Sequence, residues 1–118
     1  MKEIIIDGEK YVLASPPIGG RWVIVGNGPW GLWFGRVIAS DEEIVATKSA
    51  RLYDARNIRY WYGRNGGITS LAAHGLCGPK AAQSKIGAPI KSTLLLDVKA
   101  VHDCSAECVA TFAAHEVK

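Results

Sequence analysis

The sequence predicts an α+β fold, a mostly antiparallel β-sheet meander with one or two short helices, the last of them C-terminal. Runs of β-branched and aromatic residues separated by glycine-containing turns fill the first half of the chain. Serines that can cap a helix, followed by apolar residues at helical spacing, appear only in the second half. With 118 residues, 48% of them hydrophobic, the chain has the length and composition of a single folded domain, 1–118.

The first part, residues 1–14, is predicted to be a β-hairpin. Two apolar runs, Ile4–Ile6 and Tyr11–Leu13, flank the pair Asp7-Gly8. Glycine supplies the positive φ that a tight hairpin turn requires. The prolines and glycines of residues 15–20 remove ladder donors and favour bends, so a loop or linker should follow.

Residues 21–62 are predicted to form the β meander. Arg21–Gly26 has no clear polar face, which is typical of a central strand. After the turn at residues 27–31, a strand over Leu32–Ala39 contains Gly35, which marks a bulge or a close backbone approach. Ser40-Asp41-Glu42 should close the next hairpin. The remaining strands are expected at Glu43–Thr47, Arg51–Tyr53 and Ile58–Tyr62.

The second half carries the helical signals. Thr69 or Ser70 can cap a short helix within residues 69–75, which ends at Gly75. Cys77–Ala88 has little periodicity and is predicted to be an exposed loop. Residues 91–114 should supply strands Ser92–Leu96 and Val98–His102 and a last helix, Ala106–Ala114, capped by Ser105. The side chains of this helix expected to face the sheet are Cys108, Val109, Phe112 and Ala113.

Charge and composition narrow the function classes. A net charge of +3 permits an anionic ligand, but the chain lacks the dense Lys/Arg clusters of a protein that binds duplex nucleic acid. No apolar run approaches the ~20 residues needed to cross a bilayer, and the apolar run near Met1 is too short for a signal peptide. We therefore expect no membrane partner and a cytoplasmic location. Three cysteines, an odd number, favour reduced thiols over a disulfide framework.

The densest chemical feature is Arg51–Arg64, which places four arginines among four large aromatic rings in a hairpin-like span. In a strand, Arg59 and Trp61 share one face while Tyr60 and Tyr62 share the other, so one face can bind a ligand and the other can pack in the core. A guanidinium offers paired donors to phosphate, and a flat ring stacks on a base. The alternative, with equal weight, is that the rings lie in the core and the arginines cover them.

Aromatic residues near the 27–31 turn extend the candidate site. A tryptophan on a glycine-flanked turn, Trp30, is a stacking platform or an oligomer contact, unless it folds back over the sheet edge. The turn lacks the Lys-Ser/Thr pair and the following helix of a phosphate-binding loop. The predicted ligand-binding residues are Arg51, Arg56, Arg59, Trp61, Arg36, Trp30 and Trp33.

No residue pattern predicts catalysis, a metal site or a cofactor. His102, Cys104 and Cys108 lack the second ligand pair that a metal site needs. Cys104 stands just before a helix, where the thiol pKa can fall, and it could act as a nucleophile if folding brought His74 or His102 close. No recognisable spacing supports this alternative, so we expect a protein that is not an enzyme.

Three segments carry a resemblance to a known family. They are Asp54–Trp61, Gly67–Gly75 and Leu96–Cys108. From Trp22 onward the chain resembles small bacteriophage proteins with the pattern DARxIxYW, GLxxLAxxGP and xVxAVxxC(S/T)xEA. It is also similar to the phage Thoeris anti-defence sponges, oligomeric proteins that sequester cyclic ADP-ribose isomers and, in some members, cyclic oligonucleotides. The Gly-Pro of the pattern stands here at residues 78–79, after two extra residues, and the N-terminal hairpin has no counterpart.

The resemblance implies a phage-encoded homo-oligomer in the host cytoplasm that sequesters a small nucleotide-derived ligand without cleaving it. Four tryptophans in a small chain with few helices to cover them also favour a homo-oligomer. The alternative is a phage accessory protein that acts as a protein–protein interaction module or inhibitor. Such a module would use the same Trp and Arg residues as interface hot spots.

Overall fold

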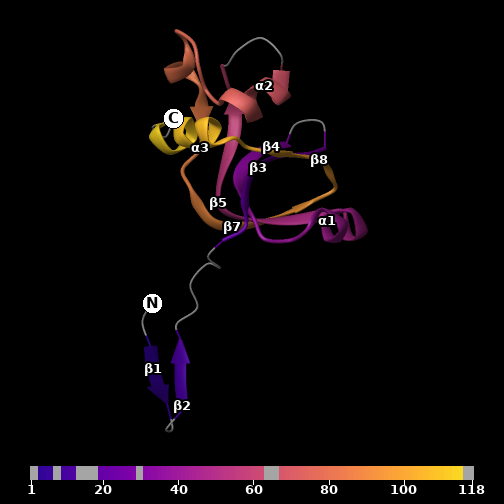
Figure 1. The fold of residues 1–118 in the computed structure, drawn as a ribbon, viewed down its shortest axis with the longest axis vertical. Helices are drawn as coiled ribbons and strands as arrows, with labels where there is room; N and C mark the ends of the chain where they lie inside the picture. Colours follow the sequence, from indigo (N-terminus) through magenta and orange to yellow (C-terminus); the bar gives the residue numbers. More distant parts are fainter. Residues whose placement is uncertain (1–2, 7–8, 13–18, 29–30, 63–66, 116–118) are drawn as a thin grey trace.

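The computed structural model describes residues 3–6, 9–12, 19–28, 31–62 and 67–115, with side chains from residue 19 onward. Two antiparallel strands, β1 (Glu3–Ile6) and β2 (Glu9–Val12), form a small sheet of their own, and six further strands form a larger antiparallel sheet (Figure 1). Three helices accompany the larger sheet, the last of them C-terminal. The predicted α+β class and the N-terminal hairpin are therefore confirmed, while the Asp7-Gly8 turn lies outside the described residues.

A meander of three strands forms the centre of the larger sheet. These are β3 (Arg21–Asn27), β4 (Gly31–Val37) and β5 (Ser49–Tyr60), each antiparallel to the next. Val23, Ile24 and Val25 are completely buried, as expected of a central strand. On the far side of β3 lies β8 (Val98–Asp103). The outer edge of β5 is shared by β6 (Lys85–Ile86) and β7 (Ile90–Leu96).

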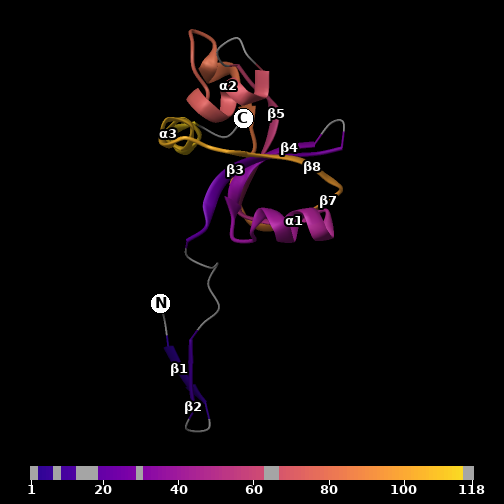
Figure 2. The same ribbon diagram turned by 45° about the vertical axis from the view of Figure 1, so that its right-hand side comes forward.

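The larger sheet is strongly curled. β7 and β8 are separated by one residue, Asp97, yet β7 pairs with β5 and β8 pairs with β3, on opposite sides of the meander. Asp97 makes this corner in the left-handed region, with φ of 55°. Figures 1 and 2 show the strands curving round above helix α1 (Asp41–Thr47).

A β-bulge in β5 bends the strand beside β4. The pairing register shifts across Gly35, so that β5 has one more residue than β4 there. Asp54 lies in the bulge with φ of 53°. A Cβ atom on Gly35 would lie 3.1 Å from the Cβ atom of Leu52, tighter than ordinary packing. The predicted bulge or close approach at Gly35 is therefore confirmed.

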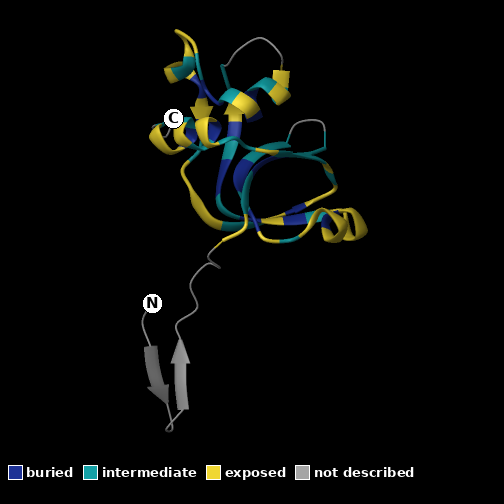
Figure 3. Cartoon of the chain, viewed as in Figure 1, coloured by how far each residue is buried: buried dark blue, intermediate teal, exposed yellow. Residues whose placement is uncertain are grey.

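Each face of the curled sheet has its own hydrophobic cluster. Helices α2 (Gly67–His74) and α3 (Ala106–Ala114) cover one face, where the Phe112 ring stacks on Phe34 at 4.2 Å between ring centres and Phe34 stacks on Trp22 at 5.1 Å. The opposite face packs around Leu52 and the single buried residue of α1, Ile44. Figure 3 shows the buried residues concentrated along the strands.

The predicted hairpin turn at residues 40–42 and strand at Glu43–Thr47 are wrong, because the segment forms α1. The Ser40 hydroxyl accepts a hydrogen bond from the Glu43 N–H at 3.2 Å and lies 3.3 Å from the Glu43 carboxylate. This N-cap, in the S-x-x-E pattern of a capping box and with three acidic residues in the first turn, favours a helix over the β propensity of Ile44 and Val45.

The Arg51–Arg64 segment is not hairpin-like either, since Ser49–Tyr60 is one continuous strand. Ile58 is buried, but Tyr60 is 50% exposed and its hydroxyl lies 2.7 Å from that of Tyr62. Tyr60 therefore does not lie in the core, and Tyr62 is only half-buried. The strand ends at Tyr60 and its register with β6 shifts there, which breaks the alternation assumed from the sequence.

The later elements match the predictions more closely. Helix α2 begins at Gly67, slightly earlier than predicted, and Ser105 caps α3 by accepting from the Cys108 N–H at 3.0 Å. Cys108 and Phe112 are buried, but Ala113 is exposed. The predicted loop Cys77–Ala88 is only partly a loop. It contains a 3-10 turn and β6, and both Ser84 and Ile86 are completely buried.

Candidate ligand-binding site

The structure does not bring the predicted arginines to one place. Arg36 is largely buried and holds the bulge of β5. Its Nη2 atom lies 3.1 Å from Oδ2 of Asp54, and its Nη1 atom donates to the Gly19 carbonyl at 2.6 Å. The guanidinium carbon lies 5.8 Å from the centre of the Tyr53 ring. Arg36 is thus engaged with its own chain.

Arg56 is also engaged with its own chain, since it is only 5% exposed. Its Nε atom donates to the Gly87 carbonyl at 2.8 Å, and Nη1 donates to the Phe112 carbonyl. Burial lowers the pKa of Arg56 from its ordinary value. The adjoining cavity has a volume of about 150 Å³. This is below the ~300–1,000 Å³ of typical ligand sites.

Arg51 is exposed and lies near the start of β5, where Nη1 is 3.3 Å from the Ser92 hydroxyl. Arg59 stands eight residues further along the same strand. At roughly 3.3 Å per residue, the two lie about 26 Å apart along the strand. One small ligand therefore does not contact both.

Arg59 and Trp61 line one pocket at the C-terminal end of β5. Its volume is about 360 Å³. The Arg59 side chain is exposed and has no hydrogen-bond or ion-pair partner within the described part of the chain. Trp61 is half-buried and packs against the cluster that contains Phe34. The other lining residues are Gly26, Gly28, Gly31, Leu32, Ile58 and Ile68.

Two of the glycines have different reasons to be glycine. A Cβ atom on Gly31 would lie 1.8 Å from Oδ1 of Asn27, so the turn itself demands glycine there. A Cβ atom on Gly26 would find its nearest neighbour, the Gly31 carbonyl, at 3.9 Å, which is ordinary contact. Neither packing nor backbone conformation therefore requires glycine at position 26, and its small size leaves space in the pocket.

The two remaining predicted aromatic residues do not contribute to the described pocket. Trp30 lies outside the described residues. Trp33 is half-buried and packs against the cluster around Leu52, on the opposite face of the sheet. Sequence reasoning set the glycine turn aside because no helix follows it, and it did not identify Leu32 or Ile68. The close spacing of Gly26, Gly28 and Gly31 was the sequence signal that could have indicated that this turn lines the pocket.

The pocket has the chemistry of a binding site. Its described lining offers one unpaired guanidinium, one indole ring and apolar or glycine surface, with no carboxylate, imidazole or thiol. A guanidinium beside an aromatic ring suits an anion attached to a planar group. An aspartate, glutamate, histidine or cysteine is the usual general acid, base or nucleophile, and none is at hand in this lining.

The surroundings of Cys104, the thiol considered as a nucleophile, shift its pKa in the direction opposite to the one expected. A hydrogen bond with Cys108, together with burial, raises the pKa of Cys104. The predicted lowering of this pKa is therefore wrong, because the neighbouring thiol and the loss of water outweigh the helix N-terminus.

The described residues show neither a metal-type cluster nor a membrane-spanning helix. They contain no group of three or more histidine, cysteine, aspartate or glutamate side chains placed to hold a metal ion. No helix among them has the length and hydropathy to span a membrane.

The fold and the pocket together define a small α+β domain with a cationic, aromatic-lined pocket at one end of its longest strand. The model of a family described as a domain of unknown function, DUF6948, matches residues 20–112, and the chain belongs to this family. The match includes the larger sheet and the pocket and leaves out the N-terminal hairpin. No curated protein and no solved structure matches the chain.

Proposed function

We propose that the protein binds and sequesters a small nucleotide-derived signal without cleaving it, with the ligand in the Arg59–Trp61 pocket. The observation that carries the proposal is the Arg59 guanidinium, which has no partner among the described residues and lies beside an indole ring in a pocket of about 360 Å³. Among the predicted arginines, Arg36, Arg51 and Arg56 already donate to groups of the chain. Arg59 is therefore the arginine best placed to meet a phosphate.

The ligand class follows from two lines of support. A phosphate matches the charge of Arg59, and a purine ring matches the flat surface of Trp61. The resemblance to phage anti-defence sponges adds cyclic ADP-ribose isomers and cyclic oligonucleotides as the specific candidates. In this proposal the protein is phage-encoded and acts as a homo-oligomer in the cytoplasm of the host.

The test is retention and release of defined probes. Purified full-length protein is incubated with a cyclic ADP-ribose isomer or a cyclic dinucleotide, separated from free probe and then heated to denature it. Mass spectrometry of the supernatant should recover the probe intact. A cleaved product would make the protein an enzyme, and retention of neither probe would overturn the proposed ligand class.

Arg59→Gln and Arg51→Gln form a matched pair for this experiment, because both arginines are exposed and lie on the same strand. Loss of one charged hydrogen bond, about 1.5–3 kcal/mol, should weaken retention by Arg59→Gln more than tenfold. Arg51→Gln should retain the probe like the unmodified protein. Equal retention by both variants would exclude the pocket as the site.

A second candidate function is a protein–protein interaction module, and the surface of β7 favours it. Ile90, Leu94 and Leu96 are 43%, 48% and 64% exposed. They are separated by even numbers of residues in β7, which places them on one face of the strand. Exposed apolar rows of this kind mark interaction sites. This function predicts that neither probe is retained and that Leu94→Glu abolishes partner binding while Arg59→Gln leaves it intact.

A further inference from the structure

An open strand edge lies beside an apolar groove on the larger sheet. The strand is β8, which pairs with β3 on one side only. The Cys104 N–H donates to the Trp22 carbonyl at 2.9 Å, continuing the ladder between the two strands. Backbone groups alternate in direction along an antiparallel ladder. The N–H and C=O groups of His102 therefore point toward β3, while those of Val101 and Asp103 point away from it. Their outward N–H and C=O groups have no backbone partner among the described residues.

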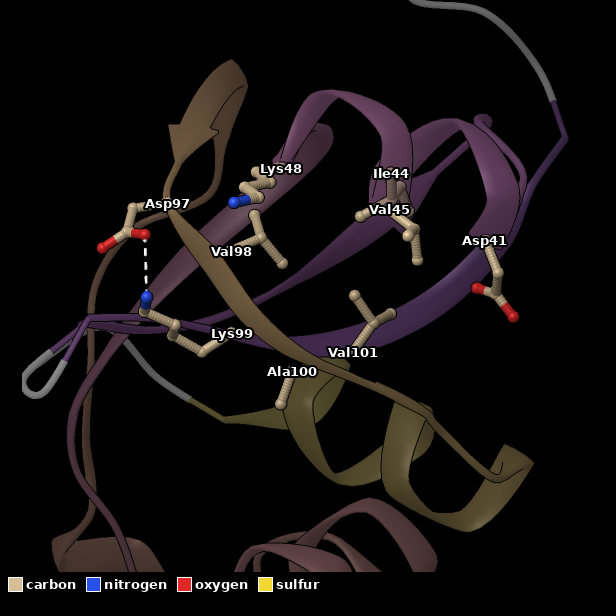
Figure 4. A pocket seen from close by; sticks show the side chains of 9 residues that line it. All are labelled: Asp41, Ile44, Val45, Lys48, Asp97, Val98, Lys99, Ala100 and Val101. Atoms are coloured by element: carbon tan, nitrogen blue, oxygen red, sulfur yellow. Dashed lines mark ion pairs between the residues drawn. The ribbon is translucent and has the colours of Figure 1, made fainter.

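The groove runs between β8 and α1 and has a volume of about 580 Å³. Figure 4 shows apolar side chains from both elements along it, with Asp41 at one end and Lys48, Asp97 and Lys99 at the other. Val45 of α1 is 74% exposed above this groove. The remaining lining residues are Ile44, Val98, Ala100 and Val101.

An open edge beside an apolar groove has the two parts needed to accept an added strand. The outward backbone groups of β8 supply hydrogen bonds, and the groove receives alternate side chains of the incoming strand. The first residue of β8 already has a backbone partner. The Val98 N–H donates to the Lys48 carbonyl at the end of α1, at 3.0 Å. The stretch from Lys99 to Asp103 remains open to a strand.

The described strands include one pair that stands apart from the larger sheet. β1 and β2 pair with each other and with no strand of the larger sheet. An isolated two-stranded hairpin is only marginally stable in water. Three consecutive isoleucines, Ile4–Ile6, make β1 apolar, and a strand of this composition needs burial to be stable.

The strand that follows the hairpin in the sequence, β3, begins next to the groove. Arg21, the first residue of β3, forms ion pairs with Asp41 at one end of the groove and with Asp103 at the end of β8. The N-terminal end of β3 therefore lies at this end of the groove. The hairpin pairs with no described strand of the larger sheet, so the edge of β8 stays open to the hairpin of another copy.

We propose that two copies of the chain exchange their N-terminal hairpins, each hairpin adding to the open edge of β8 and packing over the α1–β8 groove of the other copy. The contact is reciprocal, so it closes as a two-fold symmetric dimer. This inference gives a surface to the proposed homo-oligomer and does not depend on the ligand.

Light scattering on the full-length protein tests the proposal with variants on both sides of the contact. The unmodified protein should have the mass of a dimer. Val45→Glu, at a highly exposed helix position, and Ile5→Lys, in β1, should each halve that mass. Leu94→Glu is the matched control, because Leu94 is also exposed and apolar but lies on β7, away from the groove.

A mixture of the two interface variants makes the test specific. The Ile5→Lys copy retains an intact groove and the Val45→Glu copy retains an intact hairpin, so mixing them should restore part of the dimer through one intact contact. A monomeric unmodified protein, or a dimer that survives both substitutions, would overturn the proposal. Retention of nucleotide probes by Val45→Glu, measured in parallel, separates failure of this inference from failure of the proposed function.

Discussion

The Arg56 guanidinium on β5 donates a hydrogen bond to the main-chain carbonyl of Phe112 in the last turn of α3. Carbonyls in the last turn of a helix have no partner within the helix, and the helix dipole places partial negative charge there. The same guanidinium donates to Gly87, just after β6. One buried side chain thus joins the bulged strand, the C-terminal helix and the segment between β6 and β7.

Replacing Arg56 should destabilise the fold. Arg56→Met fills similar space but removes both hydrogen bonds, so the Gly87 carbonyl loses this donor and the Phe112 carbonyl keeps only the His115 N–H at 3.3 Å. We expect the free energy of unfolding in urea to fall by about 3 kcal/mol. Arg51→Met, at an exposed position on the same strand, should change it by less than about 0.5 kcal/mol. Equal effects of the two substitutions would contradict this structural role.

Filling the pocket should reduce binding without unfolding the protein. A methyl group on Gly26 meets only the Gly31 carbonyl at 3.9 Å and occupies pocket space. We expect Gly26→Ala to keep its thermal midpoint and to weaken retention of the nucleotide probe about tenfold, the effect of overpacking by a methyl group. Gly87→Ala is the control, since its Cβ atom would contact Asn57 at an ordinary 3.7 Å outside the pocket. Full retention by Gly26→Ala would mean that the ligand lies elsewhere.

The end of α1 offers a stabilising substitution. Lys48 follows the helix in the left-handed region with φ of 55°, a conformation that glycine adopts without strain. Lys48→Gly should raise the free energy of unfolding by about 1 kcal/mol. Such a change corresponds to an increase of about 4 °C in the thermal midpoint of a small domain. Lys48→Ala keeps the strained φ, and a similar gain in that variant would show that strain is not the cause.

The contact between Asp41 and Arg21 should make stability depend on acidity. A hydrogen bond from Arg21 lowers the pKa of Asp41 below its ordinary value. The contribution of this carboxylate to the free energy of unfolding is therefore present above its unfolded-state pKa. It is lost as pH falls through the lower folded-state pKa. We expect the difference in thermal midpoint between the unmodified protein and Asp41→Asn to be largest near neutral pH and to disappear in acid. A difference in thermal midpoint that is independent of pH would contradict this, because it would show that the introduced amide, and not the lost charge, causes the difference.

Cys104 should react slowly with alkylating reagents. Its raised pKa keeps the thiol protonated at pH 8, and only the thiolate reacts appreciably. Cys108 is completely buried, so we expect mass spectrometry of the iodoacetamide-treated folded protein to find the first adduct on Cys77, which is partly exposed. Rapid labelling at Cys104 would restore the nucleophile hypothesis.

Local signals predicted much of this fold. Consecutive valine and isoleucine residues indicated the central position of β3, Gly35 indicated the close approach to β5, and Ser105 indicated the start of α3. Each signal acts within a few residues. Helix α1 was missed because the N-cap at Ser40 competes with β-prone residues over a segment too short to show helical periodicity.

The candidate site depended more on long-range structure. The sequence grouped Arg59 with Trp61, and both line one pocket. It also grouped Arg56 with them by proximity along the chain, although the partners of Arg56 are carbonyls of residues 87 and 112. Those carbonyls come from segments that only the folded sheet brings to β5, so no local pattern distinguishes a buried arginine from a free one.

The one-residue corner at Asp97 has a consequence for the order of folding. The β3–β4 hairpin closes a short loop, whereas β8 pairs with β3 only after nearly the whole domain has been synthesised. Pairings between distant segments are slow because loop closure must precede the contacts that stabilise it. We expect the transition state to contain the β3–β4–β5 meander while β7 and β8 remain unpaired. Folding rates should then respond to substitutions at Phe34 and hardly at all to substitutions at Val101, whose effect should fall on the unfolding rate.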